Sequence, residues 1–136
     1  MKVNIFVFSS IILLFTSCYS NSIYFDIKDQ AIKSCNPTGI SQIYIENYSL
    51  NDYYSVAWSD SVHSAPGFIN MKNIQNGFTI SVSGGENKQI PSGEFKLRPS
   101  TEYTITKDQG DASSYEIKVW TNSKGYIIGT TRPDCQ

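Results

Sequence analysis

The sequence lacks an excess of either charge. Its 136 residues carry 11 lysine and arginine side chains against 12 acidic ones, a formal net charge of −1. Binding to a phosphate backbone requires a basic surface, so nucleic acid is not expected among the partners. Apolar side chains are not scarce, since aromatic residues make up 13% of the chain. That content excludes a disordered tail.

Residues that carry out catalysis are also few. His63 is the single histidine, no aspartate stands at a recognisable spacing to orient it, and the nucleophile signature Gly-x-Ser-x-Gly is absent. A histidine needs such partners to act as a general base in hydrolysis. We therefore interpret His63 as a surface residue and predict that the chain is not an enzyme.

Ligand sets for metals and cofactors are missing as well. The cysteines show no Cys-x-x-Cys spacing, which excludes the common redox motif and zinc site. The turn 108–111 holds two aspartates, too few for Ca²⁺, which takes about six to eight oxygen ligands. The glycine pair 84–85 lacks the lysine and the helix of a phosphate loop. We expect no metal and no cofactor.

No apolar run is long enough to span a membrane. The run 5–15 contains eleven uncharged residues, whereas a spanning helix needs about 20. Lys2 precedes this run, and the small residues Thr16 and Ser17 follow it. This order is typical of a secretory signal peptide. Residues 1–17 are therefore predicted to be removed from the mature protein.

The residues that follow the apolar run resemble a known processing site. Leu14-Phe15-Thr16-Ser17-Cys18 resembles the lipobox of bacterial lipoproteins, in which the cysteine is lipidated and becomes the new N-terminus. The resemblance implies a lipid anchor on Cys18 and a short tether over 18–22. Tyr19, where inner-membrane lipoproteins have aspartate, implies the outer membrane, facing the periplasm. The alternative is cleavage near 20–22, which releases a soluble secreted protein.

Two cysteines remain once Cys18 is assigned to the anchor. Cys35 and Cys135 would meet an oxidising compartment after export, where disulfides form and persist. They are predicted to form a bridge between the beginning and the end of the domain. Closing a loop of about 100 residues stabilises a fold by about 4.7 kcal/mol in the chain-entropy model.

The rest of the chain alternates apolar and polar residues with period two, which is typical of half-buried antiparallel strands. The loop 60–77 leaves room for an edge strand, and no helix is expected. The pattern predicts a two-sheet antiparallel β-sandwich of about seven to eight strands over 23–136, with a small β-barrel as the alternative. The predicted strands cover 23–28, 43–46, 54–59, 78–82, 95–97, 103–105, 115–119 and 126–130.

One short motif narrows the type of sandwich. Leu97-Arg98-Pro99-Ser100-Thr101-Glu102-Tyr103 resembles the corner between the fifth and sixth strands of fibronectin type III domains, through Leu97, Pro99 and Tyr103. The resemblance implies an immunoglobulin-like sandwich in which the Tyr103 hydroxyl bonds to backbone a few residues upstream. Trp58 would then be a core residue.

The remaining feature is a concentration of aromatic residues over 44–58. Tyr48 and Tyr53 lie on the predicted hairpin loop, and tyrosine offers rigid area with a polar tip for recognition. They form the candidate binding patch. We expect a non-catalytic cell-envelope lipoprotein that binds a protein or an envelope glycan polymer through loops at one end of the sandwich. The alternative is a periplasmic inhibitor or immunity protein against a lytic enzyme or toxin; the oligomeric state stays open.

Overall fold

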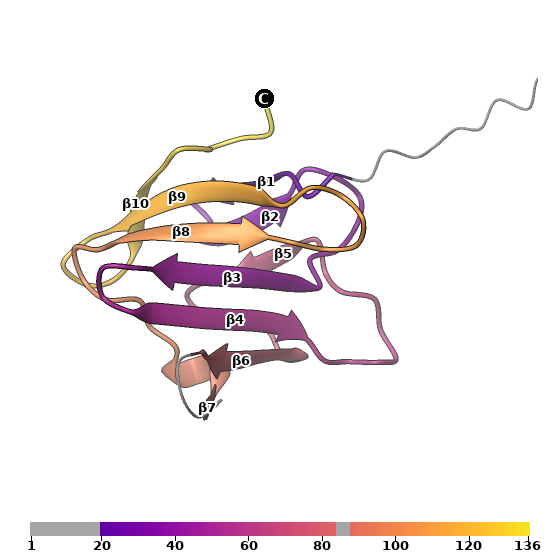
Figure 1. Cartoon of the computed structure of the whole chain (residues 1–136), viewed down its shortest axis with the longest axis horizontal. Coiled ribbons are helices and arrows are strands. Elements are labelled where there is room, and N and C mark those ends of the chain that lie inside the picture. Colours follow the sequence, from indigo (N-terminus) through magenta and orange to yellow (C-terminus); the bar gives the residue numbers. More distant parts are fainter. Residues whose placement is uncertain (1–19, 84–87) are drawn as a thin grey trace, which may run out of the picture.

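A computed structural model describes residues 20–83 and 88–136. Within these residues the chain forms ten strands and one 3-10 turn (Figure 1). The elements are β1 (Ile23–Asp26), β2 (Ala31–Ser34), β3 (Gln42–Asn47), β4 (Asp52–Trp58), β5 (Phe68–Asn70), β6 (Phe78–Val82), β7 (Lys88–Ile90), η1 (Ser92–Glu94), β8 (Glu102–Lys107), β9 (Tyr115–Thr121) and β10 (Ile127–Thr130).

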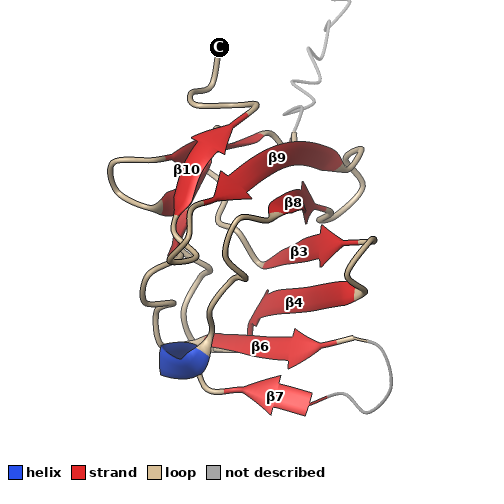
Figure 2. Ribbon diagram, turned by 90° about the vertical axis from the view of Figure 1, so that its left-hand side faces the viewer, coloured by secondary structure: helices blue, strands red, loops and turns tan. Residues whose placement is uncertain are grey.

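The strands form two antiparallel sheets that face each other. The smaller sheet has the order β1-β2-β5, and the larger one has the order β10-β9-β8-β3-β4-β6-β7. Figure 2 shows the larger sheet edge-on, with β10 at one edge and β7 at the other. Neither sheet closes on itself, so the β-sandwich is confirmed and the barrel alternative is wrong.

The core lies between the sheets because alternate residues on each strand point inward. The register aligns the inward residues into rows. Phe25, Ile32 and Ile69 lie side by side across the smaller sheet, and Ile45, Ile105 and Ile117 lie side by side across the larger one. All six are buried in the same apolar cluster. The period-two pattern of the sequence therefore reports directly which face of each strand is covered.

The sandwich has two ends with different contents. The end at the right of Figure 1, here the disulfide end, contains residues 20–22 and the loop 108–114 between β8 and β9. Cys35 lies at the same end, because its backbone N donates to the Ser22 carbonyl at 2.9 Å. The opposite end, here the loop end, contains the β1–β2 turn (27–30), the β3–β4 loop (48–51) and the β9–β10 turn (122–126). The seven residues of β9 separate the two ends by about 20 Å.

The strand count departs from the prediction in three places. β2 and β7 were not predicted, because each is short and lacks a full apolar and polar alternation. β5 occupies the loop that left room for an edge strand. The predicted strand over 95–97 is wrong: this segment crosses from η1 to β8 without pairing, although Phe95 and Leu97 are buried in the core.

Trp58, which was expected in the core, packs against the core cluster but is only partly buried. It is half-buried at the last position of β4, where its ring packs edge-on against Phe78 with centroids 4.9 Å apart. Its Nε1 donates to the carbonyl of His63 at 2.8 Å. A Cβ on Gly77, whose φ is +100°, would overlap the Trp58 ring. The Trp58 ring therefore lies directly against Gly77, at a position that only glycine fits.

Two glutamine side chains occupy strand edges that would otherwise present free backbone groups. At the free edge of β5, the side-chain amide of Gln75 accepts from Asn70 N at 3.0 Å and donates to the Phe68 carbonyl at 2.9 Å. On β10 the Gln30 amide accepts from Ile127 N at 3.1 Å and donates to its carbonyl at 2.7 Å. Each amide replaces one residue of a neighbouring strand, which protects the edge from pairing with another chain.

Candidate functional site

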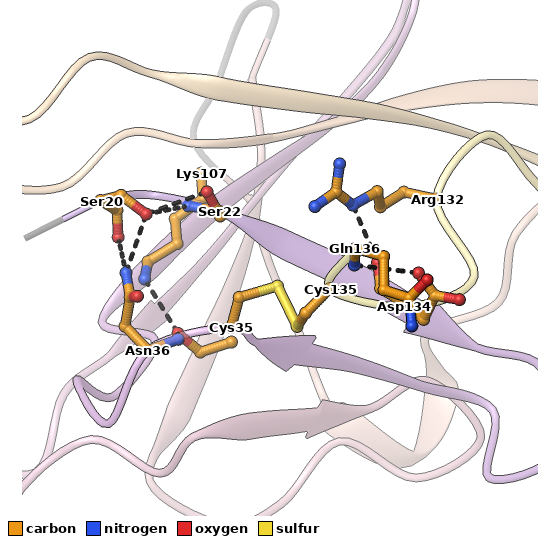
Figure 3. The surroundings of a disulfide bond; sticks show 10 residues. Ser20, Ser22, Cys35, Asn36, Lys107, Arg132, Asp134, Cys135 and Gln136 are labelled. Atoms are coloured by element: carbon orange, nitrogen blue, oxygen red, sulfur yellow. Dashed lines mark hydrogen bonds between the residues drawn. A yellow bond between two sulfur atoms is a disulfide. The ribbon is translucent and has the colours of Figure 1, made fainter.

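The predicted bridge between Cys35 and Cys135 is present (Figure 3). The two Cα atoms lie 5.5 Å apart, and the cysteines are separated by 100 positions in the sequence. This bridge ties the segment after β2 to the end of the chain. Cys18, the predicted lipid attachment site, lies outside the described residues. Within 20–83 and 88–136, no helix combines the length and apolarity needed to cross a membrane.

Tyr103 and its neighbours form a hydrogen-bonded corner at the start of β8. The Tyr103 hydroxyl accepts from Arg98 N at 3.1 Å, the bond to upstream backbone that the resemblance implied, and donates to Asp52 Oδ2 at 3.2 Å. Burial raises the pKa of Tyr103 to about 12. Leu97 is buried below the corner, and the Pro99 carbonyl accepts from the Thr101 hydroxyl.

An ion pair that the sequence reading missed completes this corner. The Arg98 guanidinium donates to both carboxylate oxygens of Asp52, at 2.6 and 2.8 Å. Asp52 is buried, whereas more than half of the Arg98 side chain is exposed. The pair links β4 to the segment before β8, which are 46 positions apart in the sequence. No local spacing could have indicated it.

The structure brings the two predicted patch residues into contact. Tyr48 is the first residue of the β3–β4 loop and Tyr53 lies on β4, and their rings meet edge-on with centroids 5.7 Å apart. The Tyr48 hydroxyl donates to Glu46 Oε2 at 2.8 Å, and this bond to a carboxylate raises the pKa of Tyr48. Asn47 holds the loop, because its Oδ1 accepts from Leu50 N at 2.8 Å. Tyr48 is 69% exposed, so its ring is available to a partner.

Further residues extend this patch across the outer face of the larger sheet. The register places Tyr53, Glu46, Thr104 and Lys118 in one row over four adjacent strands. The next row pairs Glu102 with Trp120. We call the set of Glu46, Tyr48, Tyr53, Glu102, Lys118 and Trp120 the aromatic–acidic face. Period-two alternation could have found its strand members, since they occupy the outward phase of β3, β4, β8 and β9.

The aromatic–acidic face surrounds a shallow hollow of about 230 Å³, lined by Glu46, Asn47, Tyr48, Ser49, Glu102, Thr104 and Lys118. Its charged lining consists of two carboxylates and one ammonium. Lys118 Nζ and Trp120 Nε1 each donate to Glu102 at 3.0 Å, and both bonds lower the pKa of that carboxyl. Glu102 is thus an ionised acceptor with a fixed orientation.

The single histidine has a partner that the sequence reading did not expect. Asp60 Oδ2 lies 2.7 Å from His63 Nδ1, so the statement that no aspartate orients His63 is wrong. The bond lies in the loop between β4 and β5, where three quarters of the His63 side chain is exposed. Among residues 20–83 and 88–136, no cluster of three or more metal-ligating side chains occurs.

The aromatic–acidic face combines hydrogen-bond acceptors with exposed aromatic rings. Its carboxylates accept hydrogen bonds from hydroxyl, amide or ammonium groups, while its rings offer apolar area with a polar rim. Such a combination suits the hydroxyl-rich surface of a glycan or the mixed surface of a protein. No family model, curated protein or solved structure matches the chain.

Proposed function

We propose that the chain is an exported, non-catalytic binding protein, anchored through a lipid on Cys18 to the outer membrane and facing the periplasm. Its aromatic–acidic face binds a protein or an envelope glycan polymer. The observation that carries the proposal is the exposure of Tyr48 and Trp120 beside carboxylates on an uncovered sheet face. Exposed aromatic residues with polar neighbours are enriched at recognition surfaces.

The position of the face within the fold agrees with anchoring at Cys18. Ser20 begins the described part of the chain at the disulfide end, and Asn21 donates to three carbonyls of the loop 108–114. Tyr48, by contrast, lies at the loop end (Figure 1). A protein tethered to a membrane through Cys18 therefore presents the aromatic–acidic face about 20 Å beyond its attachment.

The Tyr103 corner supports the finer assignment to immunoglobulin-like sandwiches. Its hydroxyl fixes the crossover into β8, as in the tyrosine corner of that fold class. Sandwiches of this class carry their binding loops at the ends of the sheets. The proposed binding surface here joins one such loop, 48–51, to the outer sheet face.

Binding is tested by retention of partners from an envelope extract on the immobilised protein. The variant Tyr48→Ala, Trp120→Ala should lose about 90% of the partner that the unmodified chain retains, because aromatic anchors commonly contribute 2 kcal/mol or more, about thirtyfold in affinity. The control Phe68→Ala removes an aromatic ring of similar exposure from the smaller sheet and should change nothing. Equal retention by all three proteins would refute this surface. Retention of a lytic enzyme that is thereby inhibited would identify the inhibitor alternative.

Anchoring is tested separately by fractionation. Cys18→Ser should move the protein from the membrane fraction to the periplasmic fraction, and the acyl mass on the N-terminal peptide should disappear. Ser17→Ala keeps a small residue before the cysteine and serves as the control. A Cys18→Ser protein that stays with the membrane, with no acyl mass on the unmodified chain, contradicts the lipid anchor.

A further inference from the structure

A second hollow lies at the loop end, between the two sheets. It measures about 150 Å³ and receives side chains from four separate segments: the β1–β2 turn, the residues after β5, the segment 93–97 and the β9–β10 turn. Met71, Phe95, Leu97 and Ile127 give it an apolar lining. The aromatic–acidic face uses none of these residues, so this hollow is a distinct feature of the fold.

The charges around this hollow are all of one sign. Lys72, Lys96 and Lys124 contribute to its lining, and no carboxylate does. None of the three forms an ion pair within 20–83 and 88–136, whereas Lys33, Arg98 and Lys118 each do. Three lysines lining one hollow, on a protein of net charge −1, give this part of the surface a local positive charge that attracts an anion. We call this feature the lysine hollow.

The framework of the lysine hollow is held by bonds to backbone. The buried Gln30 amide donates to the carbonyls of Ile27 and Ile127 at 2.8 and 2.7 Å, so the rear of the hollow is fixed. Gly125 has a φ of +81°, and a Cβ there would overlap the Leu97 carbonyl oxygen, which brings the β9–β10 turn against the segment 93–97. Lys72 Nζ lies 5.5 Å from the centre of the Tyr126 ring.

We propose that the lysine hollow binds a phosphomonoester carried on a small body such as a sugar ring. A phosphomonoester bears a charge of about −1.5 to −2 near pH 7, which matches three ammonium groups better than the single charge of a carboxylate. The volume corresponds to roughly five water molecules, room for the phosphate and part of its carrier. The Tyr126 ring and the apolar lining contact that carrier.

The position of the hollow favours a soluble source for this group. The β9–β10 turn and the β1–β2 turn both lie at the end opposite to Ser20 (Figure 1). A chain held to a bilayer upstream of Ser20 turns this end away from the headgroups of that bilayer. A phosphorylated sugar in solution, or on a polymer, reaches the hollow more readily than a lipid of the anchoring membrane does.

Calorimetric titration of the full chain with glucose 6-phosphate, glucose and inorganic phosphate tests the proposal. We expect glucose 6-phosphate to bind more tightly than inorganic phosphate, glucose to show no heat, and affinity to fall as salt rises. Lys72→Ala, Lys96→Ala and Lys124→Ala should each weaken binding about fivefold, and Lys124→Glu more. Lys88→Ala removes an exposed lysine from β7, outside the hollow, and should have no effect.

A lipid arm separates the two sources of the phosphomonoester. It uses the full chain with Cys18→Ser, so that no lipid anchor attaches the protein, and vesicles of phosphatidylcholine with or without phosphatidic acid. Binding of the soluble sugar phosphate without vesicle binding supports the proposal as stated. Binding to phosphatidic acid vesicles alone overturns the soluble source. Equal affinity of glucose 6-phosphate for the unmodified chain and for the variant that combines Lys72→Ala, Lys96→Ala and Lys124→Ala overturns the site itself.

Discussion

The two ends of the sandwich use their polar groups differently. At the disulfide end, polar side chains join segments of the chain: Asn21 donates to the carbonyls of Gln109, Ala112 and Ser113, and the bridge to Cys135 closes the same region. At the loop end, Lys72, Lys96 and Lys124 surround a hollow without an ion pair among the described residues. Polar groups of the disulfide end join chain segments, whereas these three lysines form no ion pair within residues 20–83 and 88–136.

The proposed anchor at Cys18 would place different mechanical loads on the two ends. A domain that is tethered upstream of Ser20 transmits any pull on the tether to β1, and the smaller sheet contains only two other strands. The contacts of Asn21 and Cys35 connect β1 and β2 to the loop after β8 and to the C-terminal residues. The loop end carries no such load. Its side chains therefore stay exposed at small cost to the fold.

The largest expected effect is loss of the bridge at the disulfide end. Cys35→Ala should lower the free energy of unfolding by up to about 4.7 kcal/mol, since the closed loop spans about 100 residues. Urea unfolding under oxidising conditions measures this loss. In reducing buffer the variant and the unmodified chain should unfold at the same urea concentration. A variant that remains weaker in reducing buffer would show that the effect comes from packing rather than from the bridge.

The next effect concerns the ion pair at the loop end whose carboxylate, that of Asp52, is buried. Arg98→Ala leaves the buried Asp52 carboxylate with the Tyr103 hydroxyl as its remaining side-chain donor, and should lower the free energy of unfolding by about 2 kcal/mol. Lys33→Ala is the matched control, because it breaks partly exposed pairs with Asp26 and Asp29 and should change stability by less than about 1 kcal/mol. If both variants lose the same free energy of unfolding, burial of the Asp52 carboxylate adds nothing to the contribution of its ion pair.

Sequence periodicity predicted the parts of the fold that alternate over several residues. β3 and β4, with their connecting loop, follow from alternation on both sides of a polar link, and β6 and β9 follow in the same way. The segment 95–97 has the same alternation but forms no strand. Its Phe95 and Leu97 reach the core from a crossover. Alternation reports which side of a segment is buried and says nothing about whether a neighbouring strand is present.

The candidate site was partly predictable for a related reason. Tyr48 and Tyr53 are close in sequence, so a hairpin was enough to bring them together. Glu46 and Lys118 join them only through the pairing of β3 with β8 and of β8 with β9, which no local pattern reveals. The lysine hollow depends on four segments and was not predictable at all.

The alternation of residues along β8 contained a further signal, which predicts that Lys107 is buried. Tyr103, Ile105 and Lys107 share one phase, and all three are buried. Lys107 thus places an ammonium inside the disulfide end, where it donates one hydrogen bond among the described residues, a long contact of 3.4 Å to the Ser34 hydroxyl. Figure 3 shows it beside Ser22 and the bridge. Desolvation lowers the pKa of Lys107. The buried ammonium therefore destabilises the disulfide end, whereas the hydrogen bonds of Asn21 and the disulfide stabilise it.

Replacement of this lysine is the smallest of the expected effects and has the opposite sign. Lys107→Met should raise the free energy of unfolding by about 1 kcal/mol at pH 7, because an apolar side chain of similar length fits a buried position without the cost of desolvating a charge. The gain should shrink as pH rises toward 10.5. Between the lowered pKa of folded Lys107 and 10.5, the folded protein has released this proton while the unfolded chain still binds it. The stability of the unmodified protein therefore rises with pH in this range.

Urea unfolding of both proteins at pH 7, 8, 9 and 9.5 measures this gain and avoids the range in which tyrosines ionise. Lys118→Met is the control on the neighbouring strand, because Lys118 is exposed and paired with Glu102, so this change removes an exposed ammonium where Lys107→Met removes a buried one. A gain at Lys107 that stays constant with pH would mean that the ammonium is solvated in the folded protein. The gain would then come from packing of the methionine side chain and not from removal of a desolvated charge.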